Sequence, residues 1–362
     1  MIISLQGLGD LLLITPLLRG LKKAYPGSRI TVLTLEANKE VLDGNSNVDK
    51  IFGFNSRNRN NIFKIAGLIY RIRKGQFDLT ICTYPSGFRS AIIAYLSGAK
   101  ERLGQGLSLF RNYCWLFTRL VPVTEIKHAV LMNMDFLGAL GFDENDFSTE
   151  LMLQISPEDK IYAERFLRCN NVFDSDTVIA VHVGGGEFTA AYRNWPLDRF
   201  ARTADELVDK YGVKIVFIGG KDDEAAVGRV TGMMKNKAIN AAGRMSLKQT
   251  AALLMKTRLL LCNNSGPMHI ASALNVHTVS IFGSADPRIH RPWGKGHIVL
   301  QRPLECAPCY YPFFRDTLKE TGSRNSWAGK KFICKTGDYR CLTSITTDYV
   351  VEAASRIING SE

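Results

Sequence analysis

The chain has 362 residues, of which 46% are hydrophobic and 22% charged, a balance typical of a globular protein and not of a disordered or fibrous one. This length exceeds what one hydrophobic core ordinarily organises and predicts two domains. Lys and Arg outnumber Asp and Glu by 46 to 34, so we expect an anionic partner. The sequence shows neither an 18-residue apolar run nor a signal peptide, so we expect a cytoplasmic protein.

Short runs rich in Val, Ile and Leu alternate with longer amphipathic segments along the chain. Strands are predicted at Met1–Leu5, Ile30–Thr34, Lys50–Phe54, Asp78–Thr83, Val178–Val183, Lys214–Ile218, Leu259–Asn263 and Thr278–Phe282. Helices are predicted at Pro16–Tyr25, Ile62–Lys74, Arg89–Leu96, His128–Leu140, Leu197–Tyr211, Asp223–Met234, Leu247–Met255, Met268–Leu274 and Thr347–Ile358. This alternation predicts an α/β protein with parallel sheets built from βαβ units.

The alternation restarts near residues 150–177, where the polar segments "SPEDK" and "CNNVFDSDT" mark a join. We therefore expect one domain at residues 1–165 and a second at 175–345. A last helical segment, 346–362, is free to pack on either domain, including back on the first.

The stretch "GLGD" follows the first predicted strand. Gly7 and Gly9 allow a tight turn and a close approach of ligand to backbone N–H groups. Asp10 stands at the carboxyl end of a strand, where ligands of parallel sheets bind, and is a candidate catalytic residue. The stretch lacks the third glycine of a dinucleotide-binding motif, and the chain contains no P-loop, which disfavours both classes.

The stretch "NNSGPMH" follows another predicted strand and opens a helix with proline in its first turn. The free N–H groups and the positive dipole end of such a helix suit a phosphate. Ser265, Gly266 and His269 are therefore candidates for binding a diphosphate, with Asn264 as a possible cap.

Two further strand ends carry candidate ligands for a phosphorylated molecule. The stretch "VHVGGG" supplies Gly184 and Gly185, which permit close approach to the backbone, and Arg193 follows as a fork-shaped phosphate donor. After "VFIGG", one of the acids Asp222, Asp223 and Glu224 could take ribose hydroxyls, or these acids could serve only the helix that follows.

A basic window covers residues 57–119, in which 11 Lys and Arg stand against two acids, a local charge of +9. It is either a solvated face or a surface for a polyanion such as nucleic acid, anionic lipid or a phosphorylated glycan. No nucleic-acid-binding signature accompanies it, so no nucleic-acid partner is expected.

The eight cysteines are not expected to form a disulfide framework in the cytoplasm. Cys82, Cys114, Cys169 and Cys262 lie singly in apolar surroundings and are expected in the core. Cys306, Cys309, Cys334 and Cys341 form a weak metal-binding candidate, because the second pair is spaced by six residues instead of two. Reduced thiols are the alternative interpretation.

Taken in order, five motifs resemble glycosyltransferase family 9, the ADP-heptose:lipopolysaccharide heptosyltransferase family. They are "GLGDLLLITPLLRGLKKAYPGSRITVLT", "VHVGGG…RNWPLDRFARTADEL", "GGKDDE", "GRMSLKQTAALL" and "NNSGPMHIASALNVHTVSIFGSADP". The resemblance implies a GT-B fold, with two Rossmann-like domains facing across a cleft. It also implies an acceptor site in the first domain, a nucleotide-sugar site in the second, inversion at the anomeric carbon and no required metal or cofactor.

The resemblance also implies roles for individual residues. Asp10 corresponds to the general base, Arg193 to a basic residue at the pyrophosphate, and Ser265, Gly266 and His269 to its partners at the helix end. Met245 and Ser246 correspond to the segment lining the adenine, and Asp223 and Glu224 to the ribose contact. The donor implied is ADP-heptose. The acceptor implied is a lipid-linked anionic glycan, with the basic window 57–119 near the inner-membrane surface.

Two departures from the family pattern keep alternatives open. Asn264 stands where the family commonly has Asp, and the glycine loop 184–192 is longer than in some members and lacks their Thr-Thr pair. Three alternatives therefore remain. The enzyme could use another nucleotide-sugar donor, it could be an epimerase or hydrolase of the same fold, or the chain could be a catalytically inactive sugar-nucleotide-binding homologue.

Overall fold

The structure is a computed structural model that describes residues 1–55, 61–84, 87–106, 113–184, 194–309, 334 and 336–360. The chain forms two compact units, one containing Met1–Gln154 and the other beginning at Ile155 and including the C-terminal helix. Each contains one six-stranded sheet, and all the strand pairings are parallel. The predicted α/β class with two parallel sheets is therefore confirmed.

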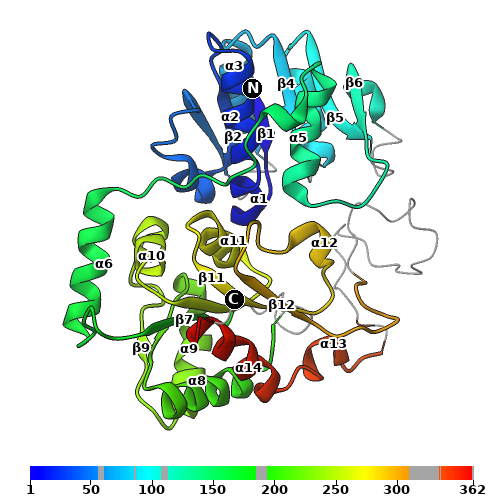
Figure 1. Ribbon diagram of the computed structural model, residues 1–362. Coiled ribbons are helices and arrows are strands. Elements are labelled where there is room, and N and C mark those ends of the chain that lie inside the picture. The colour runs from blue at the N-terminus through cyan, green and yellow to red at the C-terminus, as the bar shows by residue number, and fades with distance from the viewer. Residues whose placement is uncertain are drawn as a thin grey trace. The chain divides into compact units, whose positions relative to one another are not determined.

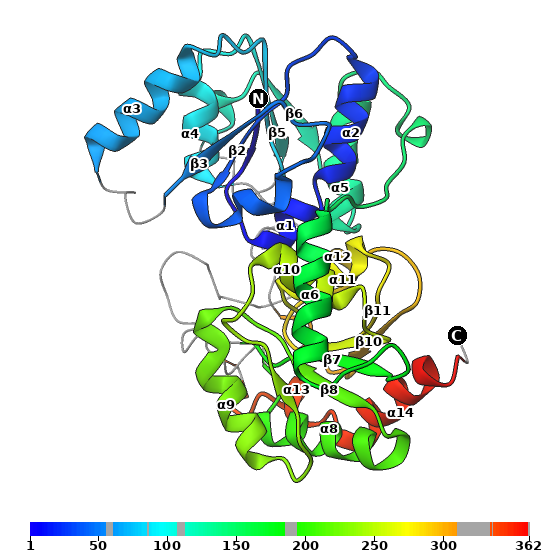
Figure 2. The same ribbon diagram turned by 90° about the vertical axis from the view of Figure 1, so that its left-hand side faces the viewer.

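The first sheet has the strand order β3-β2-β1-β4-β5-β6. Its strands are β1 (Ile2–Ser4), β2 (Thr31–Leu35), β3 (Lys50–Phe54), β4 (Leu79–Cys82), β5 (Glu101–Gly106) and β6 (Arg119–Pro122). Its helices are α1 (Leu8–Leu12), α2 (Thr15–Ala24), α3 (Ile62–Arg73), α4 (Phe88–Leu96) and α5 (Ala129–Ala139), with 3-10 turns η1 (Glu36–Leu42), η4 (Cys114–Leu116) and η5 (Glu144–Asp146). Figure 2 shows α3 and α4 on one face of the sheet and α2 and α5 on the other.

The second sheet has the strand order β12-β11-β10-β7-β8-β9. Its strands are β7 (Val178–His182), β8 (Lys214–Phe217), β9 (Ile239–Asn240), β10 (Leu259–Asn263), β11 (His277–Phe282) and β12 (His297–Gln301). Its helices are α6 (Pro157–Cys169), α8 (Leu197–Tyr211), α9 (Glu224–Met233), α10 (Leu247–Leu254), α11 (Gly266–Ala273), α12 (Pro287–His290), α13 (Arg340–Thr343) and α14 (Thr347–Ile358), with the turn η6 (Lys221–Asp223). In Figure 1, α8, α9 and α14 cover one face of this sheet, and α10 and α11 the other.

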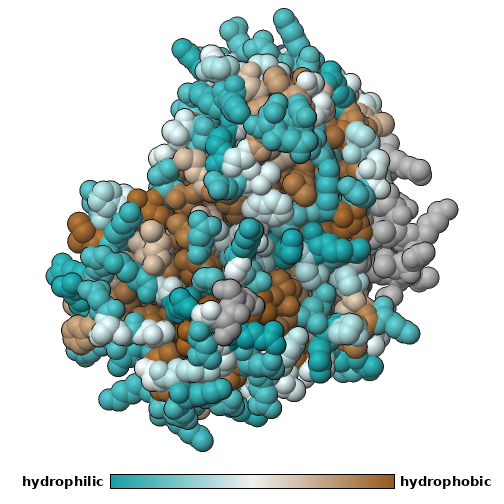
Figure 3. Space-filling view, in the orientation of Figure 1, coloured by the Kyte–Doolittle hydropathy of each residue, from teal (hydrophilic) through white to brown (hydrophobic). Residues whose placement is uncertain are grey.

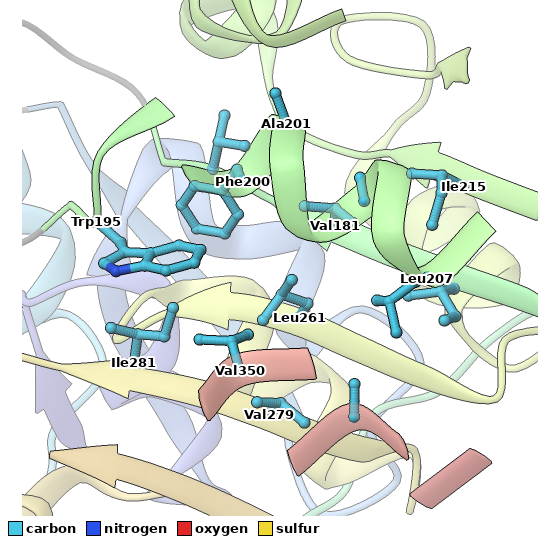
Figure 4. Packing of buried hydrophobic residues seen from close by; sticks show 14 of the residues in the cluster. Val181, Trp195, Phe200, Ala201, Leu207, Ile215, Leu261, Val279, Ile281 and Val350 are labelled. Atoms are coloured by element: carbon cyan, nitrogen blue, oxygen red, sulfur yellow. The ribbon is translucent and has the colours of Figure 1, made fainter. Parts of the chain in front are cut away.

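The core of the second unit explains why its strands read as continuous apolar runs. Helices on both faces bury every position of a central parallel strand, and β10 is buried at all five residues. Figure 4 shows Val181, Leu261 and Ile281 from neighbouring strands packed against Trp195 and Phe200. The rings of Trp195 and Phe200 meet edge to face at 5.0 Å.

The C-terminal helix α14 belongs to the second unit. Its apolar side chains Val350, Ala354 and Ile357 are part of the same buried cluster, and α14 packs against α8, β10 and β11. The unit boundary falls between Gln154 and Ile155, so α6 also belongs to the second unit, although the expected first domain extended to residue 165.

Two local features differ from the predicted elements. The first is α6, which was interpreted as part of a join. Ser156 and Asp159 cap it reciprocally, with Asp159 N donating to Ser156 Oγ at 3.1 Å, so the segment "SPED" is a helix start. The second is the start of α2, for which the pair Thr15-Pro16 predicts a threonine cap. Ile14 is the cap residue, and the Thr15 hydroxyl donates to the Leu12 carbonyl at 2.7 Å.

Polar residues make up most of the exposed surface of the two units in the view of Figure 3, with smaller apolar patches among them. Among the described residues, no helix is both long and apolar enough to cross a membrane.

Candidate active site

The first candidate site lies at the switch point of the first sheet. The chain builds this sheet outward in both directions from β1, so the order reverses between β1 and β4. Ligands of open parallel sheets bind at the carboxyl ends of the strands at such a point. Asp10 is the third residue of α1, the first helix after β1.

Backbone contacts define the position of the Asp10 carboxylate. Gly7 precedes α1, and its N–H donates to Asp10 Oδ2 at 3.1 Å. A side chain from η1, which follows β2, also holds this turn: Asn38 Nδ2 donates to the Gln6 carbonyl at 3.0 Å. Gly9 is buried within α1. The half-buried carboxylate is therefore held at the start of a helix and at the carboxyl edge of the sheet.

The second candidate site lies at the switch point of the second sheet. Here the order reverses between β7 and β10, and His182 at the end of β7 is the register partner of Cys262 in β10. Ser265, Gly266 and His269 follow β10 at the start of α11, as expected, with Ser265 as the cap residue and Pro267 in the first turn.

Three polar side chains from three strand ends meet at this point. Ser265 Oγ lies 3.0 Å from His182 Nδ1, and His182 Nε2 lies 3.5 Å from Asp223 Oδ2. His182 is only 6% exposed. The structure thus brings together two predicted donor ligands, Ser265 and Asp223, through a histidine to which the sequence analysis assigned no role.

The Asp223 carboxylate is stabilised in its ionised form. Burial opposes ionisation, but the hydrogen bond and charge of His182, together with the Gly220 N–H at 2.7 Å, outweigh it, so the pKa of Asp223 lies below its usual value. Glycine at position 219 is required here, because a Cβ would lie 2.6 Å from the Asp223 side chain.

Glu224 and the segment carrying Met245 and Ser246 also meet at the carboxyl edge of the second sheet. Gly243 has a φ of +70°, and a Cβ at this position would lie 2.0 Å from Glu224 Oε1. Met245 is half-buried. The Ser246 hydroxyl accepts from Gln249 N at 3.2 Å in a capping box, so its side chain serves α10.

A buried asparagine joins the strand ends beside the cluster. Asn263 is 1% exposed, accepts from Trp195 N at 2.9 Å and donates to the Val183 carbonyl at 2.8 Å. Its neighbour Asn264 donates its backbone N–H to Ile281 in β11 at 3.1 Å. Asn263 therefore fixes the entrance to α8 against β7 and β10.

Not every predicted ligand falls within the described residues. Gly184 does, with a left-handed φ of +77° and a side chain of Asn194 so close that a Cβ would lie 2.6 Å from its Oδ1. Gly185 and Arg193 lie outside the described residues, so their roles stay predictions. Asp10 belongs to the first unit.

The cysteines divide differently from the prediction. Cys82 and Cys262 are buried as expected, but Cys114 and Cys169 are exposed, because the first lies in the turn η4 and the second at the polar end of α6. Cys306, Cys309 and Cys334 are half-buried, and Cys341 is buried. Within the described parts of the chain, no group of three or more His, Cys, Asp or Glu side chains is arranged to hold a metal ion.

A hollow of about 1050 Å³ in the first unit lies away from Asp10. It opens at the amino edge of the first sheet, among Ile2, Ile30, Lys50, Lys74 and Lys100. Because chemistry in parallel sheets gathers at the carboxyl edge, we do not assign the acceptor to this hollow.

The most important residue that the sequence analysis missed is His182. Its position at the end of a predicted strand and before three glycines was a signal, but its partners are 83 and 41 positions away, at Ser265 and Asp223. Asn263 was missed because the sequence around it does not indicate its hydrogen-bond partners, the Trp195 N–H and the Val183 carbonyl.

Two Rossmann-like units, each with candidate site residues at the switch point of its sheet, are the architecture of the GT-B fold, and solved glycosyltransferases share it. One is a family 9 glycosyltransferase from Veillonella parvula, with a TM-score of 0.80, 28% identity and coverage of 99% of this chain and 96% of that one. Another is the Escherichia coli ADP-heptose lps heptosyltransferase II, with a TM-score of 0.73, 21% identity and coverage of 99% and 98%.

The chain belongs to glycosyltransferase family 9 (heptosyltransferase), whose family model matches residues 65–312. It is similar to lipopolysaccharide heptosyltransferase 3 of Escherichia coli, with 28% identity over 298 residues, 80% of this chain and 85% of that protein. The expected family, fold and enzyme class, a glycosyltransferase, are confirmed.

Proposed function

We propose that this enzyme transfers heptose from ADP-heptose to an acceptor in the lipopolysaccharide inner core, with inversion at the anomeric carbon. The observation that carries the proposal is the cluster of Ser265, His182 and Asp223 at the start of α11. A helix start that follows a parallel strand binds diphosphate through its N–H groups and dipole. A structural relative is described as an ADP-heptose enzyme, which supports the donor.

The donor is proposed to lie along the carboxyl edge of the second sheet. Ser265, Gly266 and His269 bind the diphosphate with Arg193, and Asp223 or Glu224 receives the ribose hydroxyls. Met245 lines the adenine. Because Ser246 caps α10, its contribution to adenine binding is proposed to come from its backbone.

Asp10 is proposed to act as the general base. It removes the proton from the attacking acceptor hydroxyl while the anomeric carbon loses the diphosphate on its opposite face, which inverts the configuration. Such a base contributes on the order of 10²–10⁴-fold in rate. The remaining acceleration comes from the donors to the departing diphosphate, where negative charge develops.

No metal or other cofactor is proposed to take part, because protein N–H groups and side chains are expected to bind the diphosphate. Transfer should therefore persist in EDTA. The thiols Cys306, Cys309, Cys334 and Cys341 are not given a part in the chemistry.

The acceptor is proposed to be lipid-linked and anionic, and the enzyme to work on the cytoplasmic face of the inner membrane. The α3 face, formed by Ile62, Phe63, Lys64, Tyr70 and Arg71, supports a membrane contact. Ile62, Phe63 and Tyr70 are 73%, 86% and 62% exposed, and α3 carries no acidic residue. Exposed apolar side chains among cations are typical of helices that lie in a lipid headgroup layer.

The experiment is a thermal-shift panel of the purified protein with ADP, GDP, UDP and ADP-heptose, followed by transfer of labelled sugar to a core acceptor. A ligand at 100 times its Kd stabilises the folded state by about 2.7 kcal/mol. We expect selective stabilisation by ADP and ADP-heptose. Selective stabilisation by UDP or GDP would reassign the donor, and donor binding without transfer would identify an inactive homologue, which Asn264 favours.

A further inference from the structure

His182 is buried at the end of β7 with both ring nitrogens engaged. Nδ1 lies 3.0 Å from Ser265 Oγ, and Nε2 lies 3.5 Å from Asp223 Oδ2. A buried imidazole between a hydroxyl and a carboxylate has its tautomer and ring orientation set by those partners. The three side chains come from three strand ends, so this arrangement is a product of the fold.

The contact with His182 changes what Ser265 does for α11. A serine at a helix cap ordinarily accepts a hydrogen bond from the first turn of its own helix. Ser265 has the extended backbone of a cap residue, with φ −149° and ψ 171°, yet its side chain makes no capping bond. Its hydroxyl is instead directed to His182, which leaves the side chain uncommitted to the helix.

The protonation state of His182 decides the direction of that contact. A neutral imidazole with its proton on Nε2, toward Asp223, accepts at Nδ1, so the single Ser265 proton must point at the ring. An imidazolium donates from both nitrogens, so Ser265 accepts from Nδ1 and its own proton is free to donate to a phosphate oxygen. The Asp223 carboxylate lies 3.5 Å from Nε2, so a proton on that nitrogen has an anionic acceptor.

We propose that Asp223 and charged His182 form a relay that turns the Ser265 hydroxyl toward the leaving diphosphate, with His182 as a positioning residue. This inference rests on the proposed function, because it places the donor diphosphate at the start of α11. Negative charge develops there in the transition state, and a preoriented donor then stabilises it without reorganisation.

The surroundings of His182 are consistent with a single dominant anionic partner. Its register neighbour Cys262 is buried, which raises the pKa of that thiol far above neutrality. Lys221, Asp222 and Glu224 flank Asp223 but are exposed to solvent. The other titratable side chain at this edge from α11 is His269, in the first turn.

The test compares His182→Ala, the conservative His182→Asn, Ser265→Ala and the double variant His182→Ala/Ser265→Ala. Each is assayed for kcat, for KM of the donor, for ADP affinity by calorimetry and for Tm. Loss of a donor to developing charge costs on the order of 10²–10³ in kcat. We expect His182→Ala to lower kcat by about tenfold or more. ADP affinity should fall in parallel, and the KM for the donor should change little.

The double variant gives the decisive readout. If His182 acts through Ser265, the double variant is no slower than Ser265→Ala alone, whereas independent roles give multiplied losses. His182→Asn should recover part of the rate, because an amide N–H can still donate to Ser265.

His277→Gln is the matched control, because His277 is a half-buried histidine at the amino end of β11 and bonds to Gly296. It should retain wild-type kcat. Multiplied losses in the double variant, or an unchanged kcat in folded His182→Asn and His182→Ala, would overturn the relay. Wild-type protein that binds no ADP would instead overturn the proposed function, and the relay with it.

Discussion

At the residue scale, Asp10 combines a structural and a proposed chemical role. Its Oδ2 accepts from the Gly7 N–H at the start of α1, a contact that an asparagine oxygen can also make. We expect Asp10→Asn to reduce kcat by about 10²–10⁴-fold, because the amide cannot take a proton. ADP affinity should stay near that of wild type, since the donor is proposed to bind the other unit.

The measurement is transfer of labelled sugar alongside calorimetry with ADP. The Tm of Asp10→Asn serves as the control for folding, because the Gly7 contact is retained. Wild-type transfer by this variant would remove Asp10 as the general base.

At the element scale, the α3 face is explained by the way α3 is anchored. Leu68 and Ile72 are buried and fix the helix to its unit, while Ile62 and Phe63 at its start are exposed to solvent. Exposed apolar residues that gather in one patch mark interaction sites, whereas single ones are ordinary. Lys64 and Arg71 on the same helix supply attraction to anionic lipid, at about 1 kcal/mol per cation.

We therefore expect Ile62→Ser/Phe63→Ser to weaken binding to vesicles containing anionic lipid by about tenfold or more, as measured by co-sedimentation. Full burial of one such side chain is worth about 1.5–3 kcal/mol, and each 1.4 kcal/mol is tenfold. Ile161→Ser is the control, because Ile161 is also exposed, at 63%, on the acid-bearing α6 of the second unit. Equal losses in both variants would argue against a specific face.

At the scale of the whole molecule, α14 closes the second unit although it lies at the far end of the chain. Ile357 is 2% exposed in the buried cluster. Replacing a buried Ile by Ala costs about 2–5 kcal/mol. We expect Ile357→Ala to lower the Tm of the transition of the second unit by about 4 °C or more, as measured by scanning calorimetry.

Glu352→Ala is the matched control on the same helix. Its exposed pair with Arg356 is worth about 0.3–0.5 kcal/mol, so the Tm should hardly move. If the two variants were equally mild, α14 would not be a required part of that core.

Local sequence patterns predicted the strongly apolar strands and the long amphipathic helices well, and the short or polar strands poorly. Lys50–Phe54, Leu259–Asn263, Leu197–Tyr211 and Thr347–Ile358 were predicted with the bounds that the structure has. The strands β5, β6, β9 and β12 were missed. β6, β9 and β12 are edge strands, which can carry polar residues, and β9 is only two residues long; β5 has the polar sequence "ERLGQG".

The sequence by itself determined the α/β class, the two sheets, the family and the candidates at single strand ends. Each of those depends on residues within a few positions of one another, through apolar periodicity, helix-start signals or short motifs. Only the tertiary structure decided that His182 lies between Ser265 and Asp223 and that α14 completes the second core. Strand order brings distant strand ends together, and strand order depends on the packing of the whole unit instead of on any local pattern.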